Sequence, residues 1–439
     1  MVLPSAEELA DLVFKEFRRL PKTGKPATNE WTILSAILMH DTAKGISKVV
    51  AIGCGTKCVG HTKRCYQGFI LNDSHAEVLA RRALLRYIYY LLKRVKEHRD
   101  DSVFQWDNEN VCFRLRAELS FHFVSTQTPC GDACIRNEAI EEKSTKEERN
   151  INDAPTEPKQ KKRKMNNGND EKEGYAPNGD DNVGAILQAC KKDTVYTGAK
   201  LIGLTDEQDA MQQKIGAVRT KPGRGDRTQS MSCSDKLARW NVFGVQGALL
   251  DTLLAQPIYF ETLNFVGGAK NEPAIRRAIY ERFIDNEFKS TRFNVHKPTI
   301  RFSETVKFEY VENDNRKNPA ATCISWCDIP LDLKPYEVSV NGRKQGVTRK
   351  MFGTLQAAVK ISKYNLLLEY VDILRVEPKL RQKYLIDLEN LENYKYCEYK
   401  KLAREYQTAW TLAKQNYFLQ WIEKIPNFKS FSLKIRPLD

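Results

Sequence analysis

The stretch Asn72-Asp73-Ser74-His75-Ala76-Glu77 begins a long helical pattern and decides how the rest of the chain is interpreted. From His75 to Val95 the apolar residues recur at helical spacing, which predicts a buried helix. The pair Pro129-Cys130 follows a predicted strand over Phe121 to Thr126 and stands where a second helix is predicted, Cys130 to Glu142. A histidine, a carboxylate and a cysteine therefore occur where helices are expected to begin.

These residue types suit a catalytic zinc site. Imidazole and thiolates are zinc ligands, and catalytic sites usually have three protein ligands and leave the fourth position to water. Glu77 can reach that water without binding the metal if it shares the first helical turn with His75. Helix starts also favour thiolates through their N–H groups and dipole. A structural zinc site is the alternative, but such sites usually fill all four positions with Cys or His.

The spacing leaves the third protein ligand open. Three residues separate Cys130 from Cys134, whereas zinc nucleobase deaminases usually have two between their cysteines. Cys134 is geometrically possible at i+4 on a helix. Cys233, in Met231-Ser232-Cys233-Ser234-Asp235-Lys236, is the other candidate.

The rest of the chain alternates helical and strand patterns, which predicts an α/β layered fold. Helices are expected over Ser5 to Leu20, Glu272 to Asp285, Leu355 to Leu374 and Tyr399 to Glu423, and strands over Ser47 to Gly53, Ile258 to Val266 and Thr322 to Cys327. Residues 143–182 differ, because only five of these 40 residues are hydrophobic. We predict that this charged insert is disordered.

Charge points to a polyanionic partner. The 70 Lys and Arg exceed the 56 Asp and Glu, giving a net charge of +14. The insert is neutral overall, so the excess lies on the folded remainder, which favours nucleic acid. A merely basic soluble enzyme is the alternative.

Targeting signals favour an intracellular protein, in the nucleus, the cytoplasm or both. The chain has eleven cysteines and no secretory signal, which favours reduced thiols inside the cell. It has no run of about 18 apolar residues, so we expect no membrane partner. Residues 158–164 (PKQKKRK) resemble a nuclear-import signal, although such a run is also typical of a solvated loop. No motif indicates an obligate protein partner.

Three motifs in order resemble one family: residues 72–77, residues 128–132 (TPCGD) and residues 231–241 (MSCSDKLARWN). They are similar to the adenosine deaminases that act on RNA, and among these to the branch that acts on tRNA. The resemblance runs from about residue 30 to the C-terminus, with the insert outside it. It implies one deaminase domain over 1–439, with its motif-bearing part at about 30–435. The implied fold is a cytidine-deaminase-like three-layer core, a mixed sheet between helices, enlarged by C-terminal helices and strands.

The resemblance also implies roles for the motif residues. Zinc would be held by His75, Cys130 and Cys233, which leaves Cys134 as a packing residue. Glu77 would shuttle a proton from water to the departing ammonia, converting adenosine to inosine. The rivals are a double-stranded RNA editing deaminase and a catalytically silent RNA-binding module.

A second cofactor, a buried inositol hexakisphosphate, is implied as well. The matching positions are Asn72, Arg81, Arg82, Lys221, Lys236, Arg239, Trp240, Lys363, Tyr396, Lys400, Tyr406, Trp421, Glu423 and Lys424. Trp410 and Ala248 depart from the lysine and serine of the duplex-editing relatives, which suggests a looser shell or a shifted ligand. A solvated basic face is the alternative for Lys363 and Lys424.

Two features favour tRNA over duplex RNA. Only about 30 residues precede the resemblance, where duplex editors carry double-stranded RNA-binding domains. Residues 221–227 (KPGRGDR) replace a loop in which those editors have a glutamate, so we expect Arg224 and Arg227 to contact RNA phosphates. An unstacked anticodon-loop adenosine costs least to flip. The resemblance implies position 37 of an alanine tRNA.

Overall fold

A computed structural model describes residues 3–95, 102–135, 198–202, 214–223, 226–267, 270–283, 288 and 290–434. The helices are α1 (Ala6–Arg19), α2 (Ala76–Arg94), α6 (Cys233–Phe243), α7 (Gly247–Asp251), α8 (Glu272–Ile279), α9 (Lys363–Val376), α10 (Pro378–Tyr384), α11 (Tyr396–Lys401) and α12 (Arg404–Asn416). Short 3-10 turns include η1 (His61–Lys63), η3 (Asp132–Cys134), η4 (Glu281–Phe283), η5 (Leu331–Leu333), η6 (Arg349–Met351), η7 (Leu355–Ala357) and η8 (Pro426–Lys429).

A mixed eight-stranded sheet forms the centre of the fold, in the order β12-β11-β8-β2-β3-β14-β15-β16. Its strands are β2 (Leu34–Asp41), β3 (Ile46–Cys54), β8 (Leu119–Ser125), β11 (Phe260–Val266), β12 (Thr299–Ser303), β14 (Thr322–Cys327), β15 (Tyr336–Val340) and β16 (Arg343–Lys344). Neighbours pair in parallel from β8 to β12 and antiparallel elsewhere. Separate small pairs are made by β1 (Glu30–Trp31), β4 (Thr56–Cys58), β5 (Asp73–His75), β6 (Phe104–Asp107), β7 (Cys112–Leu115), β9 (Lys200–Leu201), β10 (Arg219–Thr220) and β13 (Asn318–Pro319).

Helices cover both faces of the sheet. Along β2, Ala36 and Leu38 join the apolar cluster that contains Leu9 of α1, whereas Ile37 joins the cluster that contains Leu84 of α2. Successive strand residues point to opposite faces, so α1 and α2 lie on opposite sides of the sheet. The predicted class, an α/β fold with a mixed sheet between helices, is confirmed.

Gly53 sets how closely α2 packs on β3. A Cβ atom at Gly53 would lie 2.3 Å from the carbonyl oxygen of Ala76 and 2.3 Å from the amide nitrogen of Ala80. Only a glycine permits this contact between the backbones of a strand and a helix. The first turn of α2, which carries Glu77, is thereby held directly against the central sheet.

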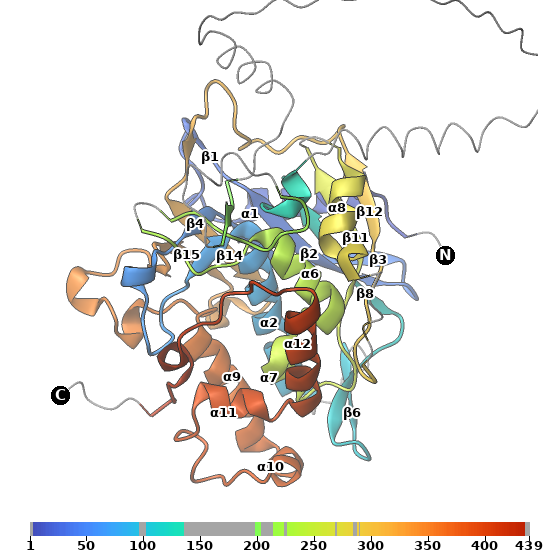
Figure 1. Cartoon of the computed structure of the whole chain (residues 1–439), viewed down its shortest axis with the longest axis vertical. Helices are drawn as coiled ribbons and strands as arrows, with labels where there is room; N and C mark the ends of the chain where they lie inside the picture. The colour runs from blue at the N-terminus through green and yellow to red at the C-terminus, as the bar shows by residue number, and fades with distance from the viewer. Residues whose placement is uncertain are drawn as a thin grey trace, which may run out of the picture. The chain divides into compact units, whose positions relative to one another are not determined.

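The C-terminal helices extend this core. Helix α9 packs on α2, and α7 contacts α9, α11 and α12. Figure 1 shows α9, α11 and α12, in orange and red, gathered below and beside α2. Residues 1–134 and 197–439 cluster as one compact unit. Among the described residues, no helix has the length and apolar character needed to cross a membrane.

Several predicted boundaries were wrong. Cys130 does not begin a helix, because Gly131 has a φ of +110° and the 3-10 turn η3 follows; residues 136–142 of the predicted helix lie outside the described part of the chain. The predicted helix over 355–374 starts at Lys363, capped by the Ser362 side chain, which accepts a hydrogen bond from the Asn365 amide. The predicted helix over 399–423 is two helices, α11 and α12, that separate at non-helical Ala403. The predicted insert at 143–182 and its basic run lie outside the described residues.

Candidate metal centre and the adjoining cationic cavity

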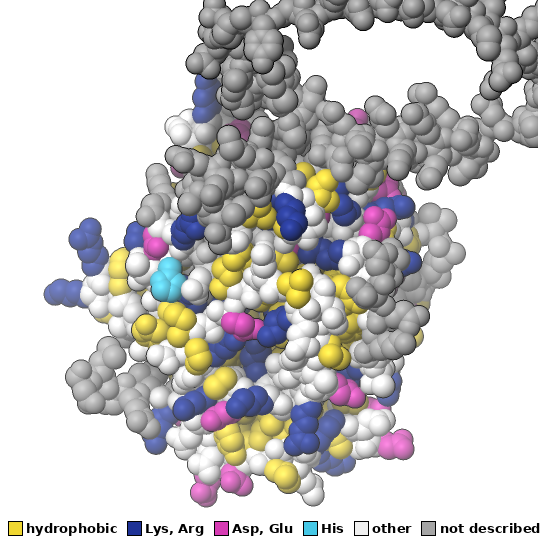
Figure 2. Space-filling view, in the orientation of Figure 1, with side chains coloured by type: hydrophobic (Ala, Val, Ile, Leu, Met, Phe, Trp, Pro, Cys, Tyr) yellow, Lys and Arg dark blue, Asp and Glu magenta, His cyan; other side chains and the backbone are white. Residues whose placement is uncertain are grey.

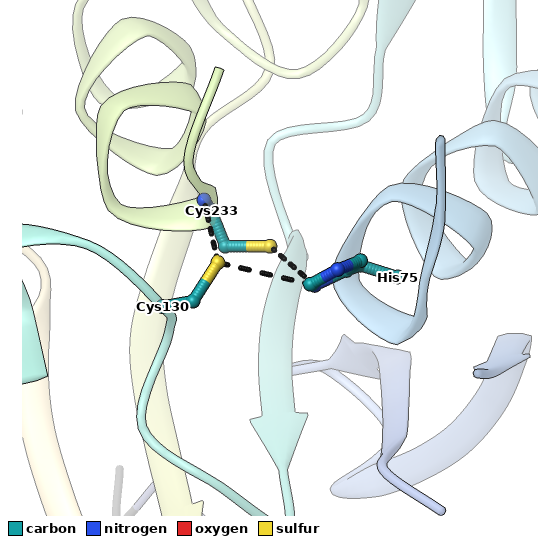
Figure 3. Close-up of side chains that lie close together, drawn as sticks. All are labelled: His75, Cys130 and Cys233. Atoms are coloured by element: carbon teal, nitrogen blue, oxygen red, sulfur yellow. Dashed lines mark hydrogen bonds between the residues drawn. The ribbon is translucent and has the colours of Figure 1, made fainter. Parts of the chain in front are cut away.

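Three elements that are distant in sequence bring His75, Cys130 and Cys233 together. His75 ends β5 and is the N-cap of α2, Cys130 lies in the loop after β8, and Cys233 is the first residue of α6. Figure 3 shows the imidazole of His75 directed toward the two thiols. Cys233 lies at the start of a helix, where free backbone N–H groups favour negatively charged sulfur.

The distances suit a tetrahedral metal. His75 Nδ1 lies 3.9 Å from Cys130 Sγ and 3.7 Å from Cys233 Sγ, and all three ligand atoms lie within 4.8 Å of one another. Zinc bond lengths in a tetrahedron place nitrogen and sulfur about 3.5 Å apart. The Cys233 amide lies 3.4 Å from Cys130 Sγ, to which it donates. Two thiols and an imidazole are a donor set that zinc prefers, so the residues fit this metal.

Glu77 is buried beside this cluster. Its side chain is 2% exposed, and its Oε2 atom has no hydrogen-bond partner among the described residues. A buried carboxylate oxygen without a partner is costly, which is typical of a functional group that awaits a substrate or water.

Cys134 does not join the cluster. Its Sγ lies 3.2 Å from the carbonyl oxygen of Pro129, and burial raises the pKa of this thiol to about 12. Among the described residues, the grouping of possible ligand atoms around His75 includes Cys130 and Cys233 but not Cys134. The spacing had left Cys134 and Cys233 open, and the geometry brings together Cys130 and Cys233.

Asp73 lies between the metal cluster and a layer of lysines. Its carboxylate pairs with Lys221 at 2.9 Å and with Lys236, and it accepts the backbone N–H of His75 at 3.0 Å. Although burial raises it, the pKa of Asp73 is held well below its usual range by the two lysines. Lys221 also donates to Cys233 Sγ at 2.9 Å. Sequence reasoning gave Asp73 no role, although it lies inside the first motif.

A second grouping, Cys58 with Asp73 and His75, shares two residues with this network. The Asp73 carboxylate already accepts bonds from Cys58, Lys221 and Lys236. Its oxygens are therefore neutralised by cations, and we assign this grouping to the support of His75 rather than to a separate metal site.

Asp73 and Lys236 also line a cavity of about 520 Å³. Thirteen of the fourteen positions predicted for a polyanion line it: Asn72, Arg81, Arg82, Lys236, Arg239, Trp240, Lys363, Tyr396, Lys400, Tyr406, Trp421, Glu423 and Lys424. Lys221 is the exception, because its side chain turns to Asp73 and Cys233 instead. Figure 2 shows Lys and Arg side chains gathered on the lower part of this face, where Figure 1 places α9, α11 and α12.

The charges in the cavity are strongly unbalanced. Its described lining contains nine Lys or Arg side chains but only two carboxylates, Asp73 and Glu423. Burial and the neighbouring cations lower the pKa of Lys363 and of Lys400 to about 7. The nearby charge of Lys363, together with burial, lowers the pKa of Lys424 well below its usual range. Such crowding is stable only beside a compensating polyanion.

The two arginines of α2 also indicate that the cavity binds an anion. Burial lowers the pKa of Arg81 and of Arg82 to about 10. Each guanidinium has one backbone acceptor, Val245 for Arg81 and Ile361 for Arg82. The Nη2 atom of Arg82 is buried without a partner among the described residues, so it lacks an acceptor that an anion would supply.

The sequence interpretation missed two lysines in the cavity lining, Lys414 and Lys429. Lys414 lies one helical turn after Trp410 on α12, and both lysines contact Glu423, at 2.5 and 3.1 Å. Trp410 and Ala248, the two departures from the duplex editors, also line the cavity. The i, i+4 spacing of Trp410 and Lys414 was the available signal for a shifted ligand.

The predicted RNA-contacting residues lie on the loop before Cys233. Arg227 is exposed, and its carbonyl oxygen accepts the N–H of His61 at 3.1 Å. Arg224 lies outside the described residues.

Comparison with known proteins identifies this site. The model of the adenosine-deaminase (editase) domain matches residues 51–425, a range that includes all three residues of the metal cluster. The chain belongs to this family. Members are adenosine deaminases, so the chain is an enzyme acting on adenosine, and the family implies a zinc ion. The recognition made from the three sequence motifs is confirmed.

Individual editase relatives fall into two groups. The tRNA-specific adenosine deaminase 1 of Drosophila melanogaster is 43% identical over 96% of this chain and 95% of the fly protein. That of Homo sapiens is 32% identical over 97% of this chain and 99% of the human protein. A double-stranded RNA-specific adenosine deaminase of Mus musculus is 25% identical over 99% of this chain but only 33% of the mouse protein. RNA is thus the substrate class of the relatives.

Proposed function

We propose that this editase catalyses the zinc-dependent hydrolytic deamination of adenosine to inosine in tRNA. His75, Cys130 and Cys233 would hold the zinc, and Glu77 would carry the proton. The observation that supports these roles best is the buried Oε2 atom of Glu77, unpartnered among the described residues and beside three converging ligand atoms. A silent binding module would have no need of such a carboxylate.

The reaction replaces the amino group at C6 of adenine with oxygen from water and releases ammonia. Zinc supplies Lewis-acid activation of that water. Glu77 accepts a proton from the attacking water and delivers a proton to the departing amino group, so no proton is gained or lost overall. Because no described residue donates a hydrogen bond to Oε2 of Glu77, this atom is available for both transfers.

Support for tRNA comes from the relatives and from the basic loop. The relatives that match over nearly their full length are named for tRNA. A cationic loop beside the metal cluster suits phosphates that flank an unstacked base. We propose the adenosine at position 37, next to the anticodon of an alanine tRNA, as the target.

The substrate is tested with total tRNA and, separately, a long RNA duplex. Inosine is detected as A-to-G changes after reverse transcription. Inosine at a single anticodon-loop adenosine is the expected result. Inosine scattered through the duplex would instead assign the chain to the duplex editors, and inosine in neither RNA would favour the silent module.

We further propose that the cavity binds inositol hexakisphosphate as a structural cofactor. Nine cationic side chains, lowered lysine pKa values and the unpartnered Arg82 nitrogen fit a compact, highly charged anion. Denaturation of the protein should release this small polyanion, and mass spectrometry should detect it. Its absence from folded, active protein would refute the proposal.

Domain organisation and location are proposed on the sequence alone. We propose a single deaminase domain interrupted by the charged insert, acting in the nucleus, the cytoplasm or both. Replacing the four basic residues of 161–164 with Gln in a fluorescent fusion tests nuclear import. Unchanged nuclear signal would remove any role for this run.

A further inference from the structure

Two segments near the metal cluster are joined at an exposed position. The turn at residues 60–64 follows β4, and the loop at 221–230, described except for residues 224 and 225, precedes Cys233. Oδ2 of Asp226 accepts two hydrogen bonds from Thr62, one from its amide at 2.8 Å and one from its hydroxyl at 2.7 Å. We call these contacts between the turn and the loop the clasp.

Further contacts reinforce the clasp. The amide of His61 donates to the carbonyl of Arg227 at 3.1 Å, and Arg64 donates to the side chain of Gln229. The Arg64 guanidinium carbon lies 3.7 Å from the ring centroid of Phe428, on which Tyr66 also stacks. The clasp therefore connects the turn, the loop and the C-terminal segment.

Gly60 makes room for the Asp226 carboxylate. A Cβ atom at Gly60 would lie 2.5 Å from Oδ2 and 2.7 Å from the Cβ of Asp226. Any other residue would displace the carboxylate from Thr62. The backbone of the turn is thus shaped around the side chain of the loop.

Both ends of the loop are fixed at the metal cluster. The amide of Lys221 donates to the carbonyl of Ser230 at 2.7 Å, and the Thr228 hydroxyl donates to the carbonyl of Lys221 at 2.6 Å. The buried Lys221 ammonium contacts Cys233 and Asp73. Since the base of the loop is already fixed, the clasp determines where Asp226 and Arg227 lie.

The position of an acid here is unexpected on electrostatic grounds. Asp226 is the only acidic residue between positions 221 and 230, in a loop that also contains Lys221, Arg224 and Arg227. A negative charge weakens the attraction of such a loop for RNA phosphates. The presence of Asp226 is explained if its hydrogen bonds to Thr62 matter more than its charge.

We infer that Asp226 is a positioning residue, which holds the loop against the turn so that the exposed Lys63 and Arg227 form a fixed basic rim for the RNA backbone beside the metal cluster. This inference rests on the proposed RNA substrate. A rim that is already ordered does not lose conformational entropy when RNA binds, so the clasp should act on RNA affinity. The chemical step at Glu77 should be affected little.

Two substitutions at Asp226 separate position from charge. Asp226→Ala removes both the clasp and the charge, whereas Asp226→Asn removes the charge and keeps a carbonyl oxygen that can accept both bonds from Thr62. Charge alone predicts that both variants bind RNA more tightly. The clasp predicts that Asp226→Ala raises KM for tRNA roughly three- to tenfold, the usual contribution of one or two hydrogen bonds, with kcat nearly unchanged. Asp226→Asn should match or improve on the wild-type KM.

Matched variants control for side effects. Gly60→Ala should displace the carboxylate without changing any charge, and so should raise KM as Asp226→Ala does. Gly198→Ala is its control, because a Cβ there meets no atom within 4 Å. Asp332→Ala, at an exposed aspartate on η5, removes the same charge elsewhere and should leave KM unchanged.

Limited trypsin digestion measures the clasp without using activity. Cleavage after Arg227, followed by mass spectrometry, should be faster in Asp226→Ala and Gly60→Ala than in the wild type and the controls. A wild-type cleavage rate in both variants would refute the clasp. Faster cleavage with an unchanged or lower KM would refute its role in RNA binding. If the wild-type protein forms no inosine in tRNA, the proposed function fails, while the trypsin result still stands.

Discussion

The guanidinium carbon of Arg239 lies 3.7 Å from the ring centroid of Trp410. This contact explains why a tryptophan lines a cationic cavity. Trp421 and Tyr406 also lie within 6 Å of the same guanidinium, at 5.4 and 5.9 Å. Duplex editors have a lysine at position 410. In this chain the Trp410 ring instead contacts the guanidinium of Arg239, a charge that α6 supplies.

Replacing Trp410 should therefore destabilise the protein. The side chain is buried, so Trp410→Ala should lower the free energy of unfolding by about 3–5 kcal/mol, through the cavity and the lost contact with Arg239. Urea unfolding measures the change. Leu412→Ala, at an exposed position on the same helix, should change stability by less than about 1 kcal/mol. Equal effects of the two substitutions would contradict this packing role.

Lys414 and Lys429 should take over the binding role of the missing lysine. The double variant Lys414→Gln, Lys429→Gln should retain less inositol hexakisphosphate per mole of purified protein than the wild type, since two of the cavity's cations are neutralised. The readout is mass spectrometry after denaturation with a labelled internal standard. Lys401→Gln, at an exposed lysine that does not line the cavity, is the control. If the double variant retained as much inositol hexakisphosphate as the wild type, these two lysines would pair with Glu423 and not with the ligand.

The lowered lysine pKa values predict an effect of pH on stability. Lys363 and Lys400 have a pKa of about 7 in the folded protein without a ligand and 10.5 as the ordinary value. Between these values the unfolded chain binds more protons, so the stability of protein stripped of polyanion should rise from pH 7 to pH 9. Protein loaded with polyanion keeps both lysines charged and should not gain. Melting temperatures of both forms at the two pH values test this, and identical slopes would contradict it.

Glu77→Gln should separate metal binding from catalysis. The variant keeps the shape of the side chain but cannot accept a proton, so inosine formation should fall by a factor of about 10²–10⁴. Zinc content, measured by atomic emission, should stay at the wild-type value. Glu261→Gln, at an exposed glutamate, should retain full activity. Wild-type activity in Glu77→Gln would assign the proton transfer to another group.

Cysteine substitutions should distinguish the ligand candidates. Cys233→Ala removes a thiol from the cluster and should abolish stable zinc binding, whereas Cys134→Ala should keep it, because the Cys134 thiol faces backbone carbonyls. The measurement is zinc content after dialysis against a weak chelator. Zinc loss in Cys134→Ala with a normal melting temperature would reverse the assignment.

Sequence patterns predicted those parts of the molecule in which local chemistry determines structure. Helix α1 follows from its apolar spacing and the Ser5 cap, and β3 and α2 follow from their apolar patterns. The helix predicted at Cys130 was wrong because Gly131 has a positive φ, and the spacing of apolar residues does not reveal the conformation of a single residue. Asp73 and the lysines at 414 and 429 were missed because their importance depends on neighbours that are distant in the sequence.

The cavity lining also has a consequence for the time order of synthesis. His75, Cys130 and Cys233 leave the ribosome well before Lys363, and the cavity lysines at 424 and 429 follow later still. Arg81 and Arg82 are therefore made early, but the wall that encloses them is completed last. If the cavity holds a polyanion, that anion cannot be enclosed before the segment that carries Lys424 and Lys429 has been made. A chain cut short before α11 would leave both arginines without the enclosure that their burial requires.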